Sequence, residues 1–505
     1  MTAVVGVEAE QRNSETPPFA VGAVGVITGL AAIAMFASIG RYGFFGDEWY
    51  FVAAGRRLAA GYADQGPLVP VIAWAMDGLA PGSLVALRVP AVLLTLIAIV
   101  VSAQIAREFG GARGAQVLTA AAYATSPFLL VQGTQLATNT VDTALWVVIS
   151  WLVVRWVRTR RDGLLLAAGA VTALDMQVKW LIPFFWIAIA VAVLVYGPRE
   201  LPKRPALWAG AAFAVVCTVP TLVWQARHEW PQLGMGAQVS AEQDTVGGRI
   251  TFVPLALAAA GILGVVLLGF GLWALWRWEP LRPYRFLALT TVVLAVAFLA
   301  MNGRSYYVVG IYPAVMAAGA VWFTRDAATW RKWVGGVLVV ISLVPVLFSL
   351  PWQAESDIEP AASDEAAGLA LGLYGKFGWP ELARATADAY TALPERERSS
   401  AVIIADSYWQ ASALDVQRAE YGLPAVYSPN RGFGYFGTPP DTATTVLWVG
   451  GDGSEPRTRC SSVTEVGRAD ARLGIPGVTS DVTLWRCDHP RAPWSREWPN
   501  MLRLG

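Results

Sequence analysis

The chain has 505 residues, of which 55% are hydrophobic and only 15% are charged, and its mean hydropathy is +0.46. This composition excludes an ordinary soluble protein and predicts a protein of the lipid bilayer. The formal net charge of +1 leaves no excess of Lys and Arg that could form a nucleic-acid footprint, which excludes nucleic acid as a partner.

Apolar segments close to the length needed to cross about 30 Å of hydrocarbon recur through the first 350 residues. They predict about eleven transmembrane helices, at 19–39, 86–106, 114–132, 141–157, 163–178, 181–196, 206–224, 252–275, 285–301, 306–323 and 334–351. The first segment is too long for a signal-peptide core and lacks a convincing cleavage site, so we expect it to be a retained span.

Every second loop between these helices is basic, as is typical of cytoplasmic loops. The basic loops contain Arg107 and Arg113; Arg155, Arg158, Arg160 and Arg161; Arg199, Lys203 and Arg204; Arg277, Arg282 and Arg285; and Arg325, Arg331 and Lys332. We therefore expect residues 1–18 to form a cytoplasmic segment, and the alternate loops, including the long loop 41–85, to face outward. An odd number of spans within 19–351 also places residues 352–505 outside.

Residues 352–505 are rich in Asp, Glu, Ser, Thr, Gly and Pro, and predict a separate domain. A strand that turns into a helix is expected at 401–417, with further strands at 444–451 and 482–487, which together indicate a small α/β domain. Cys460 and Cys487 both lie in this domain, and an oxidising compartment would permit a disulfide between them.

The outer loop that follows the first span contains the pair Asp47 and Glu48 among aromatic residues. A carboxylate at a membrane interface suits the proton transfer that accompanies attack by a hydroxyl or amine, so Asp47 is our candidate general base. The alternative is that both acids only cap a helix that begins near Trp49.

Asp142 lies at the outer end of the fourth predicted span, where an ionisable residue indicates a function unless it caps the helix. Asp175 and Lys179 lie four residues apart and could pair on one helix face, although Lys179 could instead contact a phosphate. Arg304 is followed at once by Tyr306 and Tyr307, a composition that suits either a lipid phosphate or anchoring at the interface.

No His or Cys cluster has the spacing of metal ligands, and His228 stands alone beside Arg227. A divalent cation could still be held by Asp47, Glu48 and Asp142. The sequence contains no glycine-rich phosphate loop or dinucleotide motif in a strand-to-helix setting, which argues against a cytoplasmic nucleotide sugar as the donor.

Several motifs, in this order and spacing, resemble the bacterial family 39 glycosyltransferases. These enzymes are relatives of the protein O-mannosyltransferases and lipid A aminoarabinose transferases and have the GT-C fold. The motifs are FFGDEWYF (44–51), GYADQGPLVPVIAW (61–74), TNTVDTALW (138–146), LVWQARHEWPQL (222–233), SYYVVGIYPAVMAAGA (305–320) and SYWQASALDVQRAEYGLPAVYS (407–428). The resemblance implies a polytopic GT-C protein whose small α/β domain is extracytoplasmic.

The resemblance also implies site residues. Asp47 would be the base, Glu48 would support it, and Asp142 would be a second outer acid. At Asp64 the aminoarabinose transferases have a Glu followed by a Lys, whereas Gln65 follows here, which removes one phosphate contact. The remaining candidates for the phosphate are the cations Lys179, Arg227 and Arg304, with Tyr306 and Tyr307 beside them.

The implied reaction is an inverting transfer of a sugar from a polyprenyl-phosphate donor at the outer face of the cytoplasmic membrane, with no soluble cofactor required. The sugar, a mannose-like hexose or a pentose, stays open, as does the acceptor. Two other classes fit the sequence. One is a transporter or flippase for a lipid-linked cell-envelope precursor, although the acids gather at the outer ends of spans rather than at mid-membrane. The other is a non-catalytic scaffold.

Overall fold

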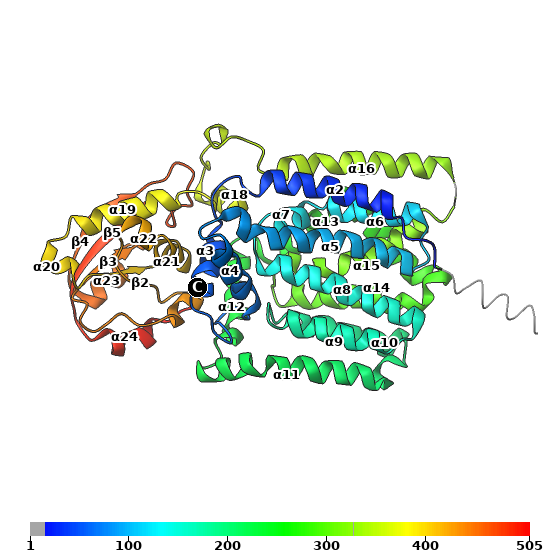
Figure 1. The fold of residues 1–505 in the computed structure, drawn as a ribbon, viewed down its shortest axis with the longest axis horizontal. Helices are drawn as coiled ribbons and strands as arrows, with labels where there is room; N and C mark the ends of the chain where they lie inside the picture. Colours follow the sequence, from blue (N-terminus) through cyan, green and yellow to red (C-terminus); the bar gives the residue numbers. More distant parts are fainter. Residues whose placement is uncertain (1–15, 327) are drawn as a thin grey trace, which may run out of the picture.

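The structure, a computed structural model, describes residues 16–326 and 328–505. Most of the predicted cytoplasmic segment, 1–18, therefore lies outside the described residues. A bundle of long helices and a smaller α/β domain lie end to end (Figure 1). The chain is thus mostly helical, with a small sheet domain after the last long helix, as the sequence predicted.

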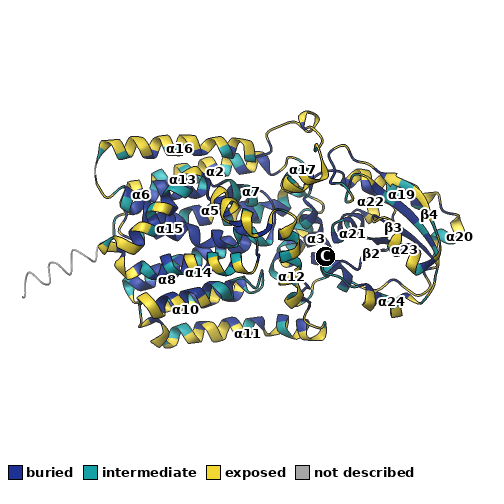
Figure 2. Ribbon diagram, turned by 180° about the vertical axis from the view of Figure 1, so that it is seen from behind, coloured by how far each residue is buried: buried dark blue, intermediate teal, exposed yellow. Residues whose placement is uncertain are grey.

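Eight helices of the described ranges are long and apolar enough to cross a membrane. They are α2 (Val21–Ser38), α5 (Leu84–Glu108), α8 (Thr138–Thr159), α11 (Pro205–Arg227), α13 (Gly248–Arg277), α14 (Arg285–Ala300) with the 3₁₀ turn Glu279–Tyr284, α15 (Tyr312–Phe323) with the 3₁₀ helix η3 (Ser305–Ile311), and α16 (Thr329–Ser349). Each coincides with a predicted span. In α2, α11 and α16 only 17% to 22% of the apolar stretch is buried, and these helices form exposed edges of the bundle (Figure 2).

The other three predicted spans are shorter or interrupted. The segment 114–132 divides into α6 (Arg113–Ala124) and α7 (Pro127–Gln132), because Pro127 begins a new helix that the Ser126 side chain caps. The segments 163–178 and 181–196 form α9 (Gly163–Asp175) and α10 (Ile182–Tyr196), which are short for a full crossing. The total of eleven crossings therefore stays a prediction.

Helix α13 contains a break at Gly261, whose φ of 72° lies in the left-handed region. Side chains of two neighbouring helical segments satisfy backbone groups around this break. The Ser126 hydroxyl donates to the carbonyl oxygen of Ala259 at 2.6 Å, and the Ser342 hydroxyl accepts from the backbone N–H of Leu263 at 2.9 Å. Such pairing is what allows irregular backbone inside an apolar bundle.

Two of the predicted outer loops are themselves folded. The loop 41–85 contains α3 (Gly46–Gly55) and α4 (Leu68–Leu79), and the loop between α11 and α13 contains α12 (Pro231–Asp244). These three helices lie between the bundle and the α/β domain (Figure 1). They therefore form a layer that separates most of the α/β domain from the bundle.

The α/β domain is built on one five-stranded sheet, in the order β2-β1-β3-β5-β4. Its strands are β1 (Val402–Ala405), β2 (Val426–Tyr427), β3 (Thr445–Val449), β4 (Cys460–Ala469) and β5 (Val482–Pro490). Strands β1, β2 and β3 run parallel, whereas β5 is antiparallel to both β3 and β4. The sequence predicted β1, β3 and β5 and missed the two edge strands.

The helices of this domain surround the sheet and connect it to the bundle. They are α17 (Asp364–Leu369), α18 (Leu371–Tyr374), α19 (Trp379–Thr391), α20 (Glu395–Arg398), α21 (Tyr408–Val416), α22 (Arg418–Tyr421), α23 (Ser454–Arg459) and α24 (Trp494–Met501), with the 3₁₀ helix η5 (Arg431–Tyr435). Helix α21 follows β1 directly, as predicted, and faces α3 across the junction of the two parts.

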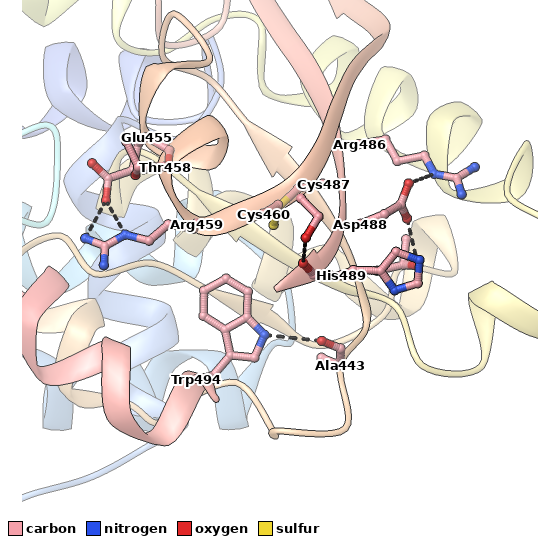
Figure 3. Close-up of a disulfide and its surroundings, with 12 residues drawn as sticks. Ala443, Glu455, Thr458, Arg459, Cys460, Arg486, Cys487, Asp488, His489 and Trp494 are labelled. Carbon is pink, nitrogen blue, oxygen red and sulfur yellow. Dashed lines mark hydrogen bonds and ion pairs between the residues drawn. A yellow bond between two sulfur atoms is a disulfide. The ribbon is translucent and has the colours of Figure 1, made fainter. Parts of the chain in front are cut away.

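The disulfide that the sequence permitted is present between Cys460, at the start of β4, and Cys487 on β5 (Figure 3). Their Cα atoms are 5.7 Å apart. Nearby, the indole N–H of Trp494 donates to the carbonyl oxygen of Ala443 at 3.3 Å, which fixes α24 to the chain before β3. Cys217, on α11, is not part of a disulfide among the described residues.

Candidate active site

A cavity of about 1300 Å³ lies where the bundle meets the α/β domain. Its wall is formed by α3, the turn before α4, the start of α8, the segment before α10, α12, η3 and loops of the α/β domain. It brings together seven of the ten residues that the sequence predicted for the site. These seven are Asp47, Asp64, Gln65, Lys179, Arg304, Tyr306 and Tyr307.

Asp47 lies in the first turn of α3, is half-buried, and faces the cavity. Its Oδ1 atom accepts two hydrogen bonds, from the Tyr408 hydroxyl at 2.7 Å and from the Trp409 indole N–H at 2.8 Å. Both donors come from the first turn of α21, so the α/β domain holds the carboxylate in place. A base needs such fixed orientation toward its substrate.

Tyr408 is buried and links Asp47 to a cation. Burial raises the pKa of Tyr408 well above its ordinary value, and the charge of Asp47 raises it further, although the nearby Arg431 acts in the opposite direction. Tyr408 therefore stays protonated and can donate to Asp47. The guanidinium of Arg431 lies 4.8 Å from the centre of the Tyr408 ring and donates to its hydroxyl at 3.3 Å.

Glu48, which the sequence places beside Asp47 as a supporting acid, does not face the cavity. Its side chain is completely buried and forms an ion pair with Arg88 of α5, with oxygen to nitrogen distances of 2.7 and 2.9 Å. The same oxygens accept from the backbone N–H groups of Phe45 and Leu136 at 2.9 and 3.0 Å. Consecutive side chains of a helix point about 100° apart, so Asp47 faces the cavity while Glu48 faces the bundle.

The alternative of a helix cap thus holds for Glu48, whose side chain returns to the backbone N–H that begins α3, and not for Asp47. Its four hydrogen bonds leave Glu48 no role in contacting a substrate. It fixes α3 instead.

Asp142 also differs from the prediction. It is buried within α8, whose N-cap is Ala137, so it is not a helix cap. It does not line the cavity and lies beside Asp175, with Lys179 nearby. Asp175 is completely buried, and its carboxylate oxygens have no hydrogen-bond partner in the described part of the chain. Asp142 and Asp175 therefore form a buried acid pair behind Lys179, rather than two separate contacts to a substrate.

Lys179 reaches the cavity wall from the segment between α9 and α10. Its ammonium donates to the Asn139 side-chain oxygen and lies 5.6 Å from the centre of the Tyr307 ring. Tyr306 stacks on Phe128 with 5.0 Å between ring centres. A cation and two tyrosines thus form one side of the cavity, next to the apolar interior of the bundle.

Asp64 and Gln65 face the cavity from the turn before α4. Asp64 accepts a hydrogen bond from the Tyr50 hydroxyl at 2.8 Å. Burial raises the pKa of Asp64, while Arg431 and the bond from Tyr50 oppose the rise. Gln65 is 3% exposed, and neither polar atom of its side chain has a partner among residues 16–326 and 328–505. Its amide is therefore available to a ligand.

Arg227 lies apart from the other predicted site residues. It lies exposed at the end of α11 and does not line the cavity. The ring of the adjacent His228 stacks on Trp224, with 4.0 Å between ring centres. The structure therefore does not bring Arg227 together with Lys179 and Arg304.

Sequence reasoning missed Arg431, Glu242, Tyr408 and Trp409, all of which line the cavity. Arg304 is paired with Glu242 of α12, and Glu242 is also paired with Arg431. A signal for Arg431 exists in the segment PNRGFGYFG, where an Arg stands among glycines and aromatic residues. Nothing in the local sequence around Glu242 marks it.

The acids considered for a divalent cation do not converge. Glu48 is bound to Arg88, Asp142 lies beside Asp175, and Asp47 is held by Tyr408 and Trp409. Within the ranges that the structure describes, no group of three or more His, Cys, Asp or Glu side chains is placed to hold a metal ion.

Residues 64–224 match the family model described as dolichyl-phosphate-mannose-protein mannosyltransferase. No curated protein is significantly similar to the chain in sequence. The structure is similar to ArnT from Cupriavidus metallidurans in the apo state, with 16% identity, a TM-score of 0.59, and coverage of 92% of this chain and 98% of ArnT. For the same protein bound to undecaprenyl phosphate, the identity is 17%, the TM-score 0.55, and the coverage is again 92% and 98%.

A second similar structure is the arabinofuranosyltransferase AftD from mycobacteria, with 13% identity and a TM-score of 0.51. The match covers 95% of this chain but only 41% of AftD. The fold thus recurs in glycosyltransferases that differ widely from this chain in sequence. The chain has the GT-C glycosyltransferase fold and resembles the mannosyltransferases and ArnT within that group.

Proposed function

We propose that the chain transfers a sugar from a polyprenyl-phosphate donor to an acceptor, with inversion at the anomeric carbon. The observation that carries this proposal is that one cavity contains an oriented acid, Asp47, and unburied cations, Lys179 and Arg304. The match to a dolichyl-phosphate-mannose family model supports it, as does the similarity in fold to a protein that binds undecaprenyl phosphate.

The reaction follows from the two kinds of group in the cavity. An acceptor hydroxyl or amine attacks the anomeric carbon, and Asp47 takes its proton as the new bond forms. The bond from that carbon to the phosphate oxygen breaks, and the polyprenyl phosphate leaves with the electron pair toward Lys179 and Arg304. Cations fixed where negative charge develops lower the barrier, and attack from the face opposite the leaving group inverts the carbon.

The lipid part of the donor needs an apolar contact beside the phosphate. The cavity wall continues from Lys179 to Leu181, Phe184 and Phe298, which belong to the bundle side. A mannose-like hexose and a pentose both fit this proposal, and the acceptor stays open.

The positive-inside rule supports a cavity at the outer face of the cytoplasmic membrane, because the basic loops join helices at the end of the bundle away from the α/β domain.

No observation on the described residues favours the alternative of a transporter or flippase for a lipid-linked precursor. The two functions make different predictions for Asp47. In a transporter or flippase, loss of Asp47 would impair movement of a lipid and not formation of a glycosidic bond.

The test is Asp47→Asn in membranes that contain the full chain, supplied with radiolabelled polyprenyl-phosphate mannose or polyprenyl-phosphate arabinose. We expect wild-type transfer of one of these sugars, and a loss of at least about 100-fold in the variant at equal expression. Glu381→Gln removes an exposed acid of α19 and is the matched control, expected to transfer normally. Normal transfer by Asp47→Asn would overturn the role of Asp47, and absence of wild-type transfer of either sugar would overturn the proposed donors.

A further inference from the structure

Helix α12 covers one side of the cavity and carries an acid that faces inward. Gln232, Met235, Val239 and Glu242 of this helix line the cavity and are partly buried, whereas only Pro231 and Gln243 of the helix are fully buried. A helix with so few fully buried residues contributes little packing energy, so it can move with a small loss of free energy.

Glu242 is bound by two arginines from different parts of the molecule. One carboxylate oxygen pairs with Arg304, just before η3 of the bundle, and the other pairs with Arg431 at the start of η5 in the α/β domain. All three side chains are 18% to 26% exposed, so they lie partly in the cavity and partly shielded from solvent. A single carboxylate thus bridges the two parts.

Two guanidinium groups around one anion form a site that suits phosphate as well as carboxylate, because the planar fork of Arg matches both. The other cations of the wall are placed differently. Arg503 is paired with Asp406, and Lys179 contacts the neutral Asn139. Within the described ranges, Glu242 is the acid that pairs with Arg304 and Arg431, so its departure would leave the Nη2 atom of each guanidinium free for an anion.

Glu242 also has a neutral neighbour on its own helix. The Gln238 side-chain amide, one turn earlier, donates to a Glu242 oxygen at 3.1 Å. The carboxylate can therefore keep one hydrogen bond while it leaves the arginines. Asp244, two residues further on, has a separate partner, because the Asn302 amide donates to its Oδ1 at 2.8 Å.

The same arginine connects this anion site to the general base. Arg431 donates to the Tyr408 hydroxyl at 3.3 Å, and that hydroxyl donates to Asp47 at 2.7 Å. Arg431 therefore lies two hydrogen bonds from the base, and an anion that it binds lies three. That arrangement suits a donor whose phosphate leaves while Asp47 accepts a proton.

We propose that Arg304 and Arg431 together bind the phosphate of the lipid donor, and that Glu242 occupies this site as a built-in anion until the donor displaces it. The proposal rests on the proposed function, which supplies a polyprenyl phosphate as the ligand. It assigns a binding role to a residue of the α/β domain, Arg431, and a competing role to a residue of α12. Displacement of Glu242 breaks the two ion pairs that join α12 to Arg304 and Arg431, while the bonds from Asn302 still hold the end of α12.

The experiment measures binding of undecaprenyl phosphate to the purified full chain in nanodiscs, for wild type and four variants. Glu242→Gln removes the competing charge. We expect this variant to bind undecaprenyl phosphate about 3- to 10-fold more tightly, because the lipid no longer has to break the ion pairs of Glu242 before it binds. Arg304→Gln and Arg431→Gln are each expected to bind at least about 10-fold more weakly. Asp244→Asn changes the same charge on the same helix and is expected to bind as wild type does.

The sign of the effect separates competition from a structural role. If Glu242 only held α12 in place, Glu242→Gln would bind more weakly, and this result or an unchanged affinity in a folded variant would overturn the proposal. Unchanged binding by Arg431→Gln would overturn the assignment of Arg431. A wild-type protein that binds no undecaprenyl phosphate would contradict the proposed donor itself. This result differs from binding whose affinity does not depend on Glu242, which would contradict only the present proposal.

Discussion

The ion pair of Glu48 and Arg88 joins α3 to α5, and both side chains are at most 1% exposed. Removing one partner of a buried pair costs about 3–5 kcal/mol, because the other charge stays buried without compensation. We expect Glu48→Gln to lower the Tm and the yield of folded protein, and the double change Glu48→Gln with Arg88→Met to recover part of both. The measurement is thermal unfolding in detergent.

Transfer per folded molecule should stay close to wild type in Glu48→Gln, in contrast to Asp47→Asn. A Glu48→Gln protein of normal stability that transfers no sugar would show that Glu48 acts in the reaction after all.

Lys376 is a second buried charge, located between α18 and α19, and burial together with Arg88 lowers its pKa to about 8, although Glu48 opposes this. The unfolded chain keeps the ordinary value of 10.5, so between these values the unfolded state binds more protons and stability rises with pH. We expect Lys376→Met to stabilise the protein at pH 7 by on the order of 3 kcal/mol, and to remove most of the rise from pH 8 to pH 10.

Thermal unfolding across this pH range checks the prediction. Lys332→Met, at an exposed position of α16, is the control and should change neither the Tm nor its pH dependence. An equal rise with pH in Lys376→Met and wild type would assign the rise to other groups.

For single residues, the sequence could identify candidate side chains but not which part of the structure each side chain faces. Asp47 was found because an acid among interfacial aromatics is unusual. Glu48 stands next to it with the same chemistry, and only the position of Arg88, forty residues away in the chain, shows that it faces the bundle. Arg431 was missed because its partners, Glu242 and Tyr408, come from other elements.

Among the elements, α3 packs tightly against α21 at Gly46. A Cβ atom at this position would collide with the Trp409 ring, which also donates to Asp47. Although Ala is normally the better residue in a helix, we expect Gly46→Ala to displace Trp409 and to reduce kcat by at least about 10-fold. The measurement is kcat and KM for sugar transfer, together with the Tm.

The matched control is Gly78→Ala in α4, where a Cβ would meet no atom within 4 Å. This variant should transfer normally and be as stable as wild type or more so. Unchanged kcat in Gly46→Ala would mean that the indole of Trp409 is dispensable for the orientation of Asp47.

The apolar spans were readable from sequence because length and hydropathy alone decide whether a helix suits the bilayer. The break at Pro127 was not anticipated within an otherwise apolar segment. Strand β4 was missed for a different reason: it is an edge strand with mostly polar side chains, such as Ser461, Thr464 and Glu465, and so lacks the apolar run of β1 and β3.

For the molecule as a whole, the disulfide closes a loop between two strands of the α/β domain, with a sequence separation of 27. Loop-closure entropy for this length corresponds to about 3.5 kcal/mol of stability. We expect the double change Cys460→Ala with Cys487→Ala to make this domain more sensitive to limited proteolysis on warming, while the helical bundle stays protected. Cys217→Ala, on α11, is the control and should leave the proteolysis pattern unchanged.

Cleavage of the bundle and the domain at the same temperature would show that the two unfold as one unit. Equal resistance of the variant and the wild type to proteolysis would show that the disulfide adds little stability.

The way in which the bundle and the α/β domain meet could not be predicted from the sequence. The contact between Tyr408 and Asp47 joins residues 361 positions apart, and no local pattern encodes such a pairing.

The cavity is walled by the bundle on one side and by the starts of α21 and η5 of the α/β domain on the other, where Tyr408, Trp409 and Arg431 lie. These two elements follow strands β1 and β2 of a sheet that is complete without the bundle. The orientation of Asp47 and the position of Arg431 thus depend on a domain that is built on its own sheet. A change of packing in that sheet, outside the bundle, would therefore reach Asp47 through Tyr408 and Trp409.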